Sequence, residues 1–329
     1  MQKYRGKVLI ILVITCFCAN VYSQEKLAQT GFQFLSVAAD ARGGAMADAM
    51  TTMALNSSSL FYNPAGMARM ECKFDATATQ NNWIAGITHN SFSLALNPFQ
   101  GRLGVFGMSV MAVDYGEIQG TMVMGNEQGY IDTEIFNPSA FAFGFGYAKT
   151  LTDKFSVGGQ VKYTGQQLGR NMVPVGEDSV TVKKNLAFAT AFDFGTMYST
   201  GFKSLKIGMS VRNFSEEIEF EKESFLLPLT FRIGISMDVL DLVGGMQDHE
   251  LLVTLDATHP RSYPEQLKFG MQYGLMNTFF GRLGYVGNSD EDNLTFGFGI
   301  QKFGAAIDYA YTPFGVFDNV QRFTVRFSL

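Results

Sequence analysis

The sequence is poor in charge, proline and cysteine. Charged residues make up 17% of the 329 residues, with 25 basic and 30 acidic side chains, whereas soluble domains average about 25%. A disordered chain combines low hydrophobicity with high net charge, so a hydrophobic content of 47% excludes that class. The acidic balance and the lack of a Lys/Arg block also argue against nucleic acid as a partner.

Cysteine and histidine are too sparse for a disulfide framework or a metal site. Two of the three cysteines lie within the first 23 residues, which leaves Cys72 without an intramolecular partner. There is no CxxC motif, and the three histidines are too far apart in the sequence to form a zinc signature. We therefore expect no bound metal and no cofactor.

Motifs of enzyme chemistry are also missing. The sequence has no GxSxG elbow, P-loop, HExxH motif or EF-hand loop. His259 lies near Asp256 and Ser262, but a solvated loop histidine explains this arrangement better than a catalytic pair does. We expect no catalytic residue and no enzymatic activity.

Residues 1–23 are typical of a signal peptide. Lys3, Arg5 and Lys7 precede an apolar stretch, residues 8–19, which is too short for a membrane-spanning helix. The small residue Ser23 follows, so we expect cleavage after it and export of the chain. No later run of 18 uncharged apolar residues predicts a spanning helix.

Beyond the predicted signal peptide, apolar residues alternate with small or polar ones. In residues 141–148, Phe or Tyr at every odd position alternates with Ala or Gly. This period of two is typical of a strand with two different faces. A transmembrane β-barrel places the apolar set against lipid and the small or polar set in the lumen. The alternative is a secreted β-sandwich or propeller, whose polar face would carry less glycine. Similar alternation occurs in residues 186–195, 205–212, 229–236, 267–274, 294–301 and 322–329.

The alternation predicts an all-β transmembrane barrel of about 14 antiparallel strands. An even number is typical of bacterial single-chain barrels. The three longest connections, residues 115–137, 167–184 and 214–227, should lie outside the cell, because outer loops are long and periplasmic turns short. Residues 239–248 are longer than expected for a periplasmic turn. The predicted strands are residues 73–81, 86–96, 102–114, 138–149, 154–166, 185–198, 203–213, 228–238, 249–258, 264–275, 278–287, 293–302, 304–312 and 320–329.

Residues 24–71 do not alternate and are rich in Ala and Met. We predict short helices, interrupted at Gly43–Gly44 and at Asn63–Pro64. A barrel this wide needs something in its lumen or it is a pore. We therefore expect residues 24–71 to form a helical hatch, or plug, inside a barrel made of residues 72–329; the alternative is a periplasmic extension. Charges expected to face inward and pair with the hatch are Asp193, Arg212, Arg232, Asp256, Lys268, Arg282, Asp308 and Arg326.

Four segments, residues 31–35 (GFQFL), 39–44 (ADARGG), 47–48 (AD) and 60–68 (LFYNPAGMA), resemble the N-terminal pattern of the PorV/PorQ family of Bacteroidota outer-membrane proteins. That family is similar to the FadL fatty-acid transporters, whose fourteen-stranded barrel carries a hatch with an Asn-Pro-Ala motif. Here Asn56-Ser57-Ser58-Ser59 stands where members often carry an acidic pair. The resemblance implies an integral outer-membrane protein whose hatch motif comprises Ala41, Arg42, Gly43, Gly44, Asn63, Pro64, Ala65 and Gly66, with a structural or gating role.

The resemblance implies two functions. A PorV-like protein is an accessory component of type IX secretion, which binds secreted proteins with a C-terminal signal domain from the translocon and passes them to the cell surface. A FadL-like protein is a channel for uptake of hydrophobic small molecules. We favour the secretion role, because residues 114–137 mix acidic and apolar side chains as a protein contact would. The high Met and Phe content would also suit a hydrophobic ligand in the lumen.

Overall fold

The computed structural model describes residues 30–329, apart from residues 126, 175–179, 221, 245, 289–292, 316 and 318. The predicted signal peptide, residues 1–23, and the first residues of the predicted hatch, 24–29, lie outside the described residues. Within the described part, no helix has the length and apolar character needed to cross a membrane.

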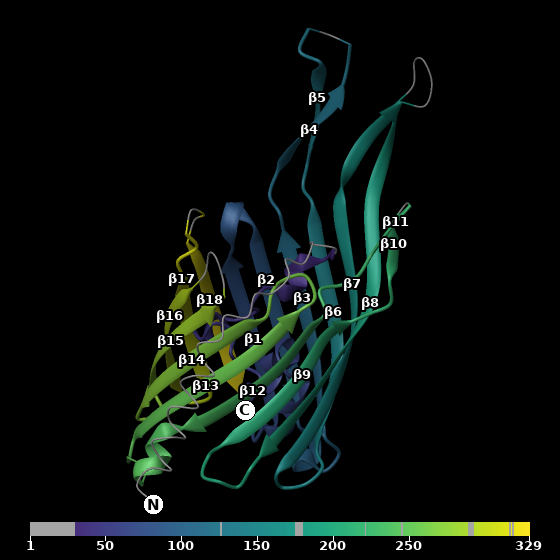
Figure 1. The fold of residues 1–329 in the computed structure, drawn as a ribbon. Helices are drawn as coiled ribbons and strands as arrows, with labels where there is room; N and C mark the ends of the chain where they lie inside the picture. The colour runs from purple at the N-terminus through teal and green to yellow at the C-terminus, as the bar shows by residue number, and fades with distance from the viewer. Residues whose placement is uncertain are drawn as a thin grey trace, which may run out of the picture.

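The described chain forms a closed antiparallel barrel of fourteen strands (Figure 1). The first and last barrel strands pair with each other, so the barrel wall has no open edge, as lipid requires. The predicted strand number is thereby confirmed. The barrel strands are β1 (Phe74–Asn82), β2 (Thr88–Leu96), β3 (Val105–Asp114), β6 (Ser139–Thr150), β7 (Phe155–Pro174), β8 (Val180–Ser199), β9 (Lys206–Phe214), β12 (Thr230–Asp238), β13 (His249–Pro260), β14 (Gln266–Leu275), β15 (Phe279–Gly287), β16 (Leu294–Lys302), β17 (Ala305–Thr312) and β18 (Val320–Ser328).

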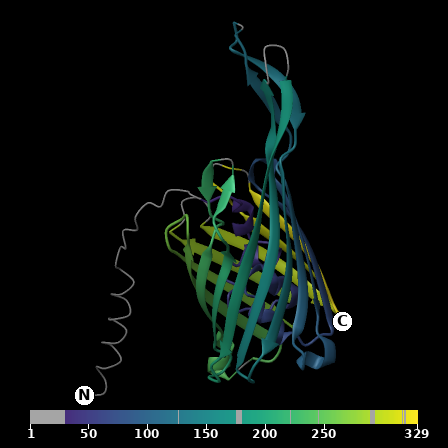
Figure 2. The ribbon, with the colours of Figure 1, turned by 90° about the vertical axis from the view of Figure 1, so that its right-hand side faces the viewer.

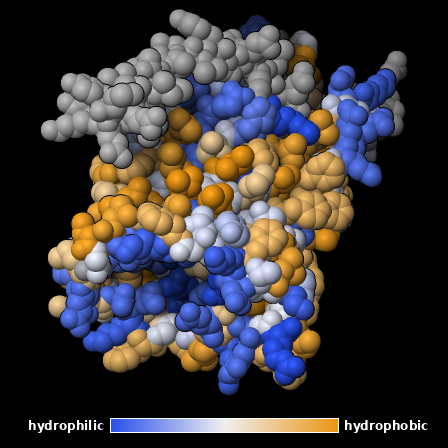
Figure 3. Space-filling view, turned by 60° about the horizontal axis from the view of Figure 1, so that its bottom comes forward, coloured by the Kyte–Doolittle hydropathy of each residue, from blue (hydrophilic) through white to orange (hydrophobic). Residues whose placement is uncertain are grey.

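The two faces of the wall differ as the alternation predicts. In β6 the aromatic residues Phe141, Phe143 and Phe145 are exposed, whereas Ala140 and Ala142 are buried toward the lumen. Figure 3 shows apolar side chains gathered in a band across one face of the molecule, with hydrophilic ones below it. This outward apolar surface is what contact with lipid tails requires.

One end of the barrel carries long projections and the other carries short turns (Figures 1 and 2). The connection after β3 contains the hairpin β4 (Ile118–Val123) and β5 (Tyr130–Phe136). Strands β7 and β8 continue to pair as far as Pro174 and Val180. The connection after β9 contains β10 (Ile218–Phe220) and β11 (Glu223–Phe225). These are the three connections predicted to be long, but the strands within them were not predicted.

The opposite end is made of tight connections and short 3-10 turns. One of them, η5 (Pro98–Gly101), links β2 to β3. The unusually long connection between β12 and β13 contains η6 (Val239–Val243), capped by the Asp238 carboxylate, which accepts a hydrogen bond from the Leu240 amide. The turn η4 (Ile84–Gly86), between β1 and β2, lies at the end with the projections, because Thr88 beside it pairs with Asp114 at the top of β3.

The described residues before β1 fill the lumen as a series of short helices. These are η1 (Gln33–Ser36), α2 (Ala41–Ala45), η2 (Asn56–Phe61) and η3 (Pro64–Arg69). Nearly all residues from Ala39 to Met67 are buried. We call residues 30–71 the hatch. Asn63–Pro64 begins η3, as predicted, but Gly43–Gly44 lies inside α2, so the predicted helix break there is wrong.

The hatch runs along the barrel from one end to the other. Thr30 pairs with Leu226 and its hydroxyl is 2.6 Å from the Ser262 hydroxyl; both partners belong to connections at the end with long projections. At the other end, the amides of Lys73 and Phe74 donate hydrogen bonds to the carbonyl of Leu329. The polypeptide therefore traverses the lumen once before the first barrel strand begins.

Candidate functional site

The first half of the hatch motif is built around α2 and its capping residue. The Asp40 carboxylate accepts a hydrogen bond from the Gly43 amide at 2.7 Å, which satisfies one free donor of the helix start. The Ala41 amide donates to the Thr324 hydroxyl of β18 at 2.8 Å, and Ala41 packs against Ala310 of β17. Burial is the main cause of the raised pKa of Asp40. This helix is therefore fixed directly to the barrel wall.

The two glycines of α2 allow close packing that any larger residue would prevent. A Cβ atom on Gly43 would overlap the Tyr62 hydroxyl group, and one on Gly44 would lie 2.7 Å from Cδ of Arg322. Arg42, which precedes the two glycines, lines a small cavity together with Asp308 and Arg326. Burial, followed by repulsion from Arg282 and Arg326, lowers the pKa of Arg42 to about 10.

Asn63 connects the second half of the motif to both the hatch and the wall. Its Nδ2 donates to the carbonyl of Thr51 at 2.7 Å and to that of Thr196 in β8 at 3.0 Å. Its Oδ1 accepts from the Ala65 amide at 3.1 Å and so caps η3, where Pro64 takes the first helical position. The Asn63 side chain is fully buried, so these bonds replace water that it cannot reach.

Where the hatch contacts the wall closely, several wall residues are glycines, which leave room for the hatch. A Cβ atom on Gly195 would overlap Oδ1 of Asn63, and one on Gly158 would lie 2.5 Å from the backbone of Pro64. Gly66 is needed on the hatch side, because a Cβ atom there would lie 2.6 Å from the carbonyl of Met53. Sequence reasoning noticed glycine on the lumen face but did not assign it to hatch contact. Further wall glycines against the hatch are Gly208, Gly270, Gly284 and Gly297.

Asp48 is the ionic anchor of the hatch; its wall partners were predicted from the sequence, but Asp48 itself was not. Its carboxylate forms a buried ion pair with Arg232 of β12. A second ion pair joins it to Lys268 of β14 at 3.4 Å. Burial favours the neutral acid, but Arg232, Lys268 and Arg212 outweigh it and lower the pKa of Asp48 to about 2. A buried charge with paired partners holds the hatch in one position.

Four of the eight predicted inward charges bind the hatch. Besides Arg232 and Lys268, the Asp256 carboxylate accepts from the Thr51 amide at 3.0 Å and its hydroxyl at 2.7 Å. The Arg212 guanidinium donates to the carbonyl of Leu35 at 3.3 Å. The other four bond within the wall: Asp193 to Lys162, Arg282 to Asp308, and Arg326 to Gln301.

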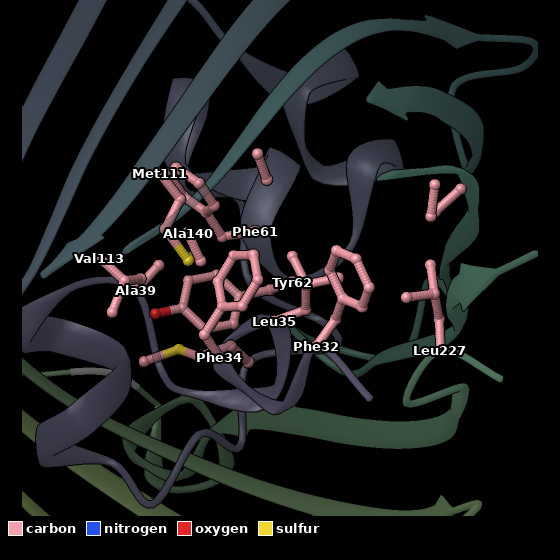
Figure 4. Close-up of a cluster of buried hydrophobic side chains, with 14 of the residues drawn as sticks. Phe32, Phe34, Leu35, Ala39, Phe61, Tyr62, Met111, Val113, Ala140 and Leu227 are labelled. Atoms are coloured by element: carbon pink, nitrogen blue, oxygen red, sulfur yellow. The ribbon is translucent and has the colours of Figure 1, made fainter. Parts of the chain in front are cut away.

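An apolar cluster fills the half of the lumen nearest the projections (Figure 4). Phe32, Phe34 and Leu35 of the hatch meet Met111 of β3 and Leu227, all of them buried. Two small cavities lie in the described lumen, with volumes of about 10 and 20 Å³. Each is large enough for about one water molecule, whereas a benzene-sized site needs roughly 150 Å³. Buried apolar side chains of the hatch occupy this part of the lumen.

The projections carry acidic and apolar side chains together. Residues 115–138 include Glu117, Glu127, Asp132 and Glu134 and no Lys or Arg. On this hairpin Val123, Met124 and Ile135 are exposed, and Val123 is 90% exposed. Exposed apolar residues beside charges are typical of a protein contact. The mixture predicted from the sequence for residues 114–137 is thus displayed beyond the barrel.

The only histidine considered for catalysis lies apart from its proposed partners. His259 Nδ1 is 2.8 Å from Glu265, and both side chains are half exposed. Asp256 faces the lumen and binds Thr51, while Ser262 bonds to Thr30. Among the described residues, no group of three or more His, Cys, Asp or Glu side chains is placed to hold a metal ion.

Comparison with solved structures defines the class of this barrel. The toluene transporter TbuX of Ralstonia pickettii is 13% identical, with a TM-score of 0.58, over 88% of this chain and 98% of the transporter. The Pseudomonas putida toluene transporter TodX is 12% identical, with a TM-score of 0.57, over 92% and 98%. A Pseudomonas aeruginosa FadL homologue is 12% identical, with a TM-score of 0.55, over 88% and 98%. The fold is that of FadL-like outer-membrane barrels.

The sequence specifies the family more closely than the fold does. Residues 20–243 match the family described as type IX secretion system protein PorV, and no curated protein matches the sequence. The chain belongs to the PorV family. The matched region includes the hatch, the β4–β5 hairpin and the β7–β8 hairpin.

Proposed function

We propose that this protein serves type IX secretion by receiving secreted proteins on its outer projections and passing them to the cell surface. The match to the PorV family over residues 20–243 is the observation that carries this proposal. The exposed apolar side chains of the β4–β5 hairpin, such as Val123 and Ile135, supply a surface for capture. The barrel then acts as an anchor in the outer membrane, and its work is done outside the lumen.

The protein is exported to the outer membrane, and its chain has three parts. Residues 1–23 direct export and are removed, residues 24–71 plug the lumen, and residues 72–329 form the barrel. The partners are outer-membrane lipid, the type IX translocon and secreted proteins with a C-terminal signal domain, in a Bacteroidota-like cell. No enzymatic step and no cofactor are needed for this role.

The hatch motif has a structural role in this proposal. Ala41, Arg42, Gly43 and Gly44 fix α2 against β17 and β18, and Asn63, Pro64, Ala65 and Gly66 fix η3 against β7 and β8. Support comes from the saturated hydrogen bonding of Asn63 and from the absence of space around the two α2 glycines. A gate would need these contacts to break during each cycle.

Purification of the full-length protein from outer membranes in mild detergent, followed by mass spectrometry, tests the proposal. We expect a very large translocon barrel, or secreted proteins that share a C-terminal domain, to copurify. A variant in which residues 118–136 are replaced by a short Gly-Ser linker should lose the secreted proteins while the barrel stays folded. Copurification of neither partner with wild type would overturn the secretion role.

Uptake of hydrophobic small molecules is the second candidate. The apolar cluster around Phe32, Phe34 and Leu35 favours it, because withdrawal of these hatch residues would leave an apolar cavity near the projections. A FadL-type channel would then yield bound lipid or fatty acid in native mass spectra of the purified protein. Ligand together with the absence of secreted proteins would lead to this function instead.

A further inference from the structure

The β4–β5 hairpin separates from the β7–β8 hairpin above the barrel wall. Within the wall, β6 pairs with β7 up to Ser139 and Gln167. Above this point, β4 and β5 form a two-stranded sheet of their own, and no ladder joins β5 to β7 among the described residues. Figure 1 shows the two hairpins as separate projections. We call the two strands that diverge here, β5 and the upper part of β7, the fork.

Local sequence features make the fork. Pro138 follows β5 and has no amide hydrogen, so it cannot continue the ladder from β6 upward. Across from it, the pairing of β7 with β8 has a bulge between Gln167 and Gly169, and Gly169 has φ 149°. The Phe136 ring packs against Gly169, where a Cβ atom would lie 2.9 Å from the ring. The side chain thus occupies the base of the fork and keeps the two strands apart.

Two strand edges border the fork, and neither has a ladder on that side among the described residues. Strand β5 pairs on one side with β4, which leaves its second edge toward β7 without a ladder. Strand β7 pairs with β8 from Gly169 to Pro174, and its edge toward β5 likewise has no ladder among the described residues. Unpaired edges attract a further strand. An isolated two-stranded hairpin is also only marginally stable in water, so β4–β5 would gain from such a strand.

The side chains of β5 specify which strand fits. Asp132 and Glu134 share one face of β5 and are exposed, while Ile131 and Ile135 share the other. In an antiparallel or parallel neighbour, residues opposite the acidic pair are favoured when basic, and those opposite the isoleucines when apolar. With four acidic and no basic residues in 115–138, the hairpin has no charge of its own to satisfy this pattern.

We propose that the fork is the capture site for secreted proteins, and that it takes an extended segment in which Lys or Arg alternates with β-branched or aromatic residues. The segment adds to the edge of β5 by main-chain hydrogen bonds, with β7 on its other side. This inference rests on the proposed secretion role and names the chemistry of its cargo. Main-chain bonds give affinity, and the charge alternation gives register.

Selection of ten-residue peptides from a random display library, against the full-length protein in lipid nanodiscs, tests the fork. We expect enrichment of alternating basic and apolar residues, and protection of residues 130–136 and 169–174 from hydrogen exchange by the selected peptide. N-methylation of every second peptide amide should weaken binding about tenfold or more, because it removes main-chain donors and keeps the side chains. Equal binding by the methylated peptide, or protection elsewhere, would overturn the proposal.

Charge reversal on two different hairpins tests whether the peptide binds the fork or any acidic surface on the projections. The double variant Asp132→Lys with Glu134→Lys should weaken the selected peptide about tenfold, since attraction becomes repulsion at two cross-strand positions. The control, Glu219→Lys with Glu223→Lys, makes the same change on the β10–β11 hairpin and should bind like wild type. If both variants weaken binding equally, the fork is not the site. Retained copurification of secreted proteins by the first variant would reject the fork and leave the secretion role standing.

Discussion

Asn63 shows how much of the hatch depends on one amide. Its side chain donates to two backbone carbonyls, one in the hatch and one in the wall, and supplies the acceptor that caps η3. Replacing it with Ala leaves the carbonyls of Thr51 and Thr196 without these donors and removes the cap. We expect Asn63→Ala to lower the free energy of unfolding of the hatch by about 2–4 kcal/mol, measured as protease resistance of the hatch against temperature.

The control for Asn63 is an exposed asparagine that makes a similar bond. Asn288 donates to the carbonyl of Glu265 at 2.9 Å from an exposed position. Because Asn288 has φ 63°, glycine removes this bond without backbone strain, and Asn288→Gly should change stability by less than about 0.5 kcal/mol. Both an anchor and a gate predict a less stable hatch in Asn63→Ala, because the same bonds are lost; only a gate predicts changed permeability with the barrel intact.

Asp48 makes the seating of the hatch sensitive to acid. Its pKa is about 2 in the folded protein, below the ordinary 3.8, so ionised Asp48 stabilises the fold above pH 3.8. That contribution is lost as pH falls from about 4 to 2 and amounts to about 2 kcal/mol at most. We expect hatch protection from protease to fall over this interval. Because burial raises the pKa of Asp40, that group opposes the effect.

Neutral variants isolate the contribution of Asp48. Asp48→Asn cannot titrate, so its stability should change less with pH between 4 and 2 than that of wild type. Asp132→Asn, at an exposed position of β5, should keep the wild-type pH dependence. Identical pH profiles for wild type and Asp48→Asn would contradict the assignment of Asp48 as the ionic anchor.

Among the elements, the barrel strands were predictable because each has one lipid face and one lumen face. Phe and Ala alternate in β6 as the membrane demands. Even β3, apolar on both faces in the sequence, belongs to the pattern, since inward Met111 and Val113 pack in the hatch cluster. The β4–β5 hairpin was missed because its strands project beyond the barrel, so neither carries the alternation of large apolar and small residues that marks the strands of the wall.

The contacts of the hatch could be predicted only in part. Opposite charges on strands and hatch suggested pairing, and Asp48 with Arg232 fulfils that expectation. Which charges meet depends on the strand register, so Asp308 and Arg282, both expected to face the hatch, pair with each other across the wall. The Gly43–Gly44 pair was wrongly predicted to end a helix, because glycine occurs both at helix ends and where elements pack closely. Here the two glycines make room for Tyr62 and Arg322.

Wall glycines offer a direct test of hatch packing at the level of whole strands. Gly158→Val on β7 places side-chain atoms against the backbone of Pro64, which cannot yield as a flexible side chain would. We expect the barrel to form and the hatch to be displaced or destabilised by about 1–3 kcal/mol. Gly281→Val on β15 is the control, because a Cβ atom there meets nothing within 4 Å. Protease mapping of residues 30–71 reads out both variants.

At the scale of the whole molecule, the filled lumen predicts a barrel that does not conduct. In planar bilayers we expect the wild-type protein to show no steady ion current, because the buried hatch fills the described lumen. A variant lacking residues 30–69 should conduct, since fourteen strands alone enclose an aqueous channel. Retention of the heat-modifiable barrel band confirms folding of that variant. Steady conductance by wild type would contradict a sealed hatch.

The path of the chain through the lumen restricts the order of events during biogenesis. Thr30 lies at the end with projections, and β1 begins at the other end, beside Leu329. Barrel closure joins β1 to β18, and the hatch is tethered directly to β1. A hatch that filled the lumen after closure would have to thread a narrow, finished cylinder. This topology favours closure of the wall around a hatch already in place, so that the hatch would be a template for insertion as well as a seal.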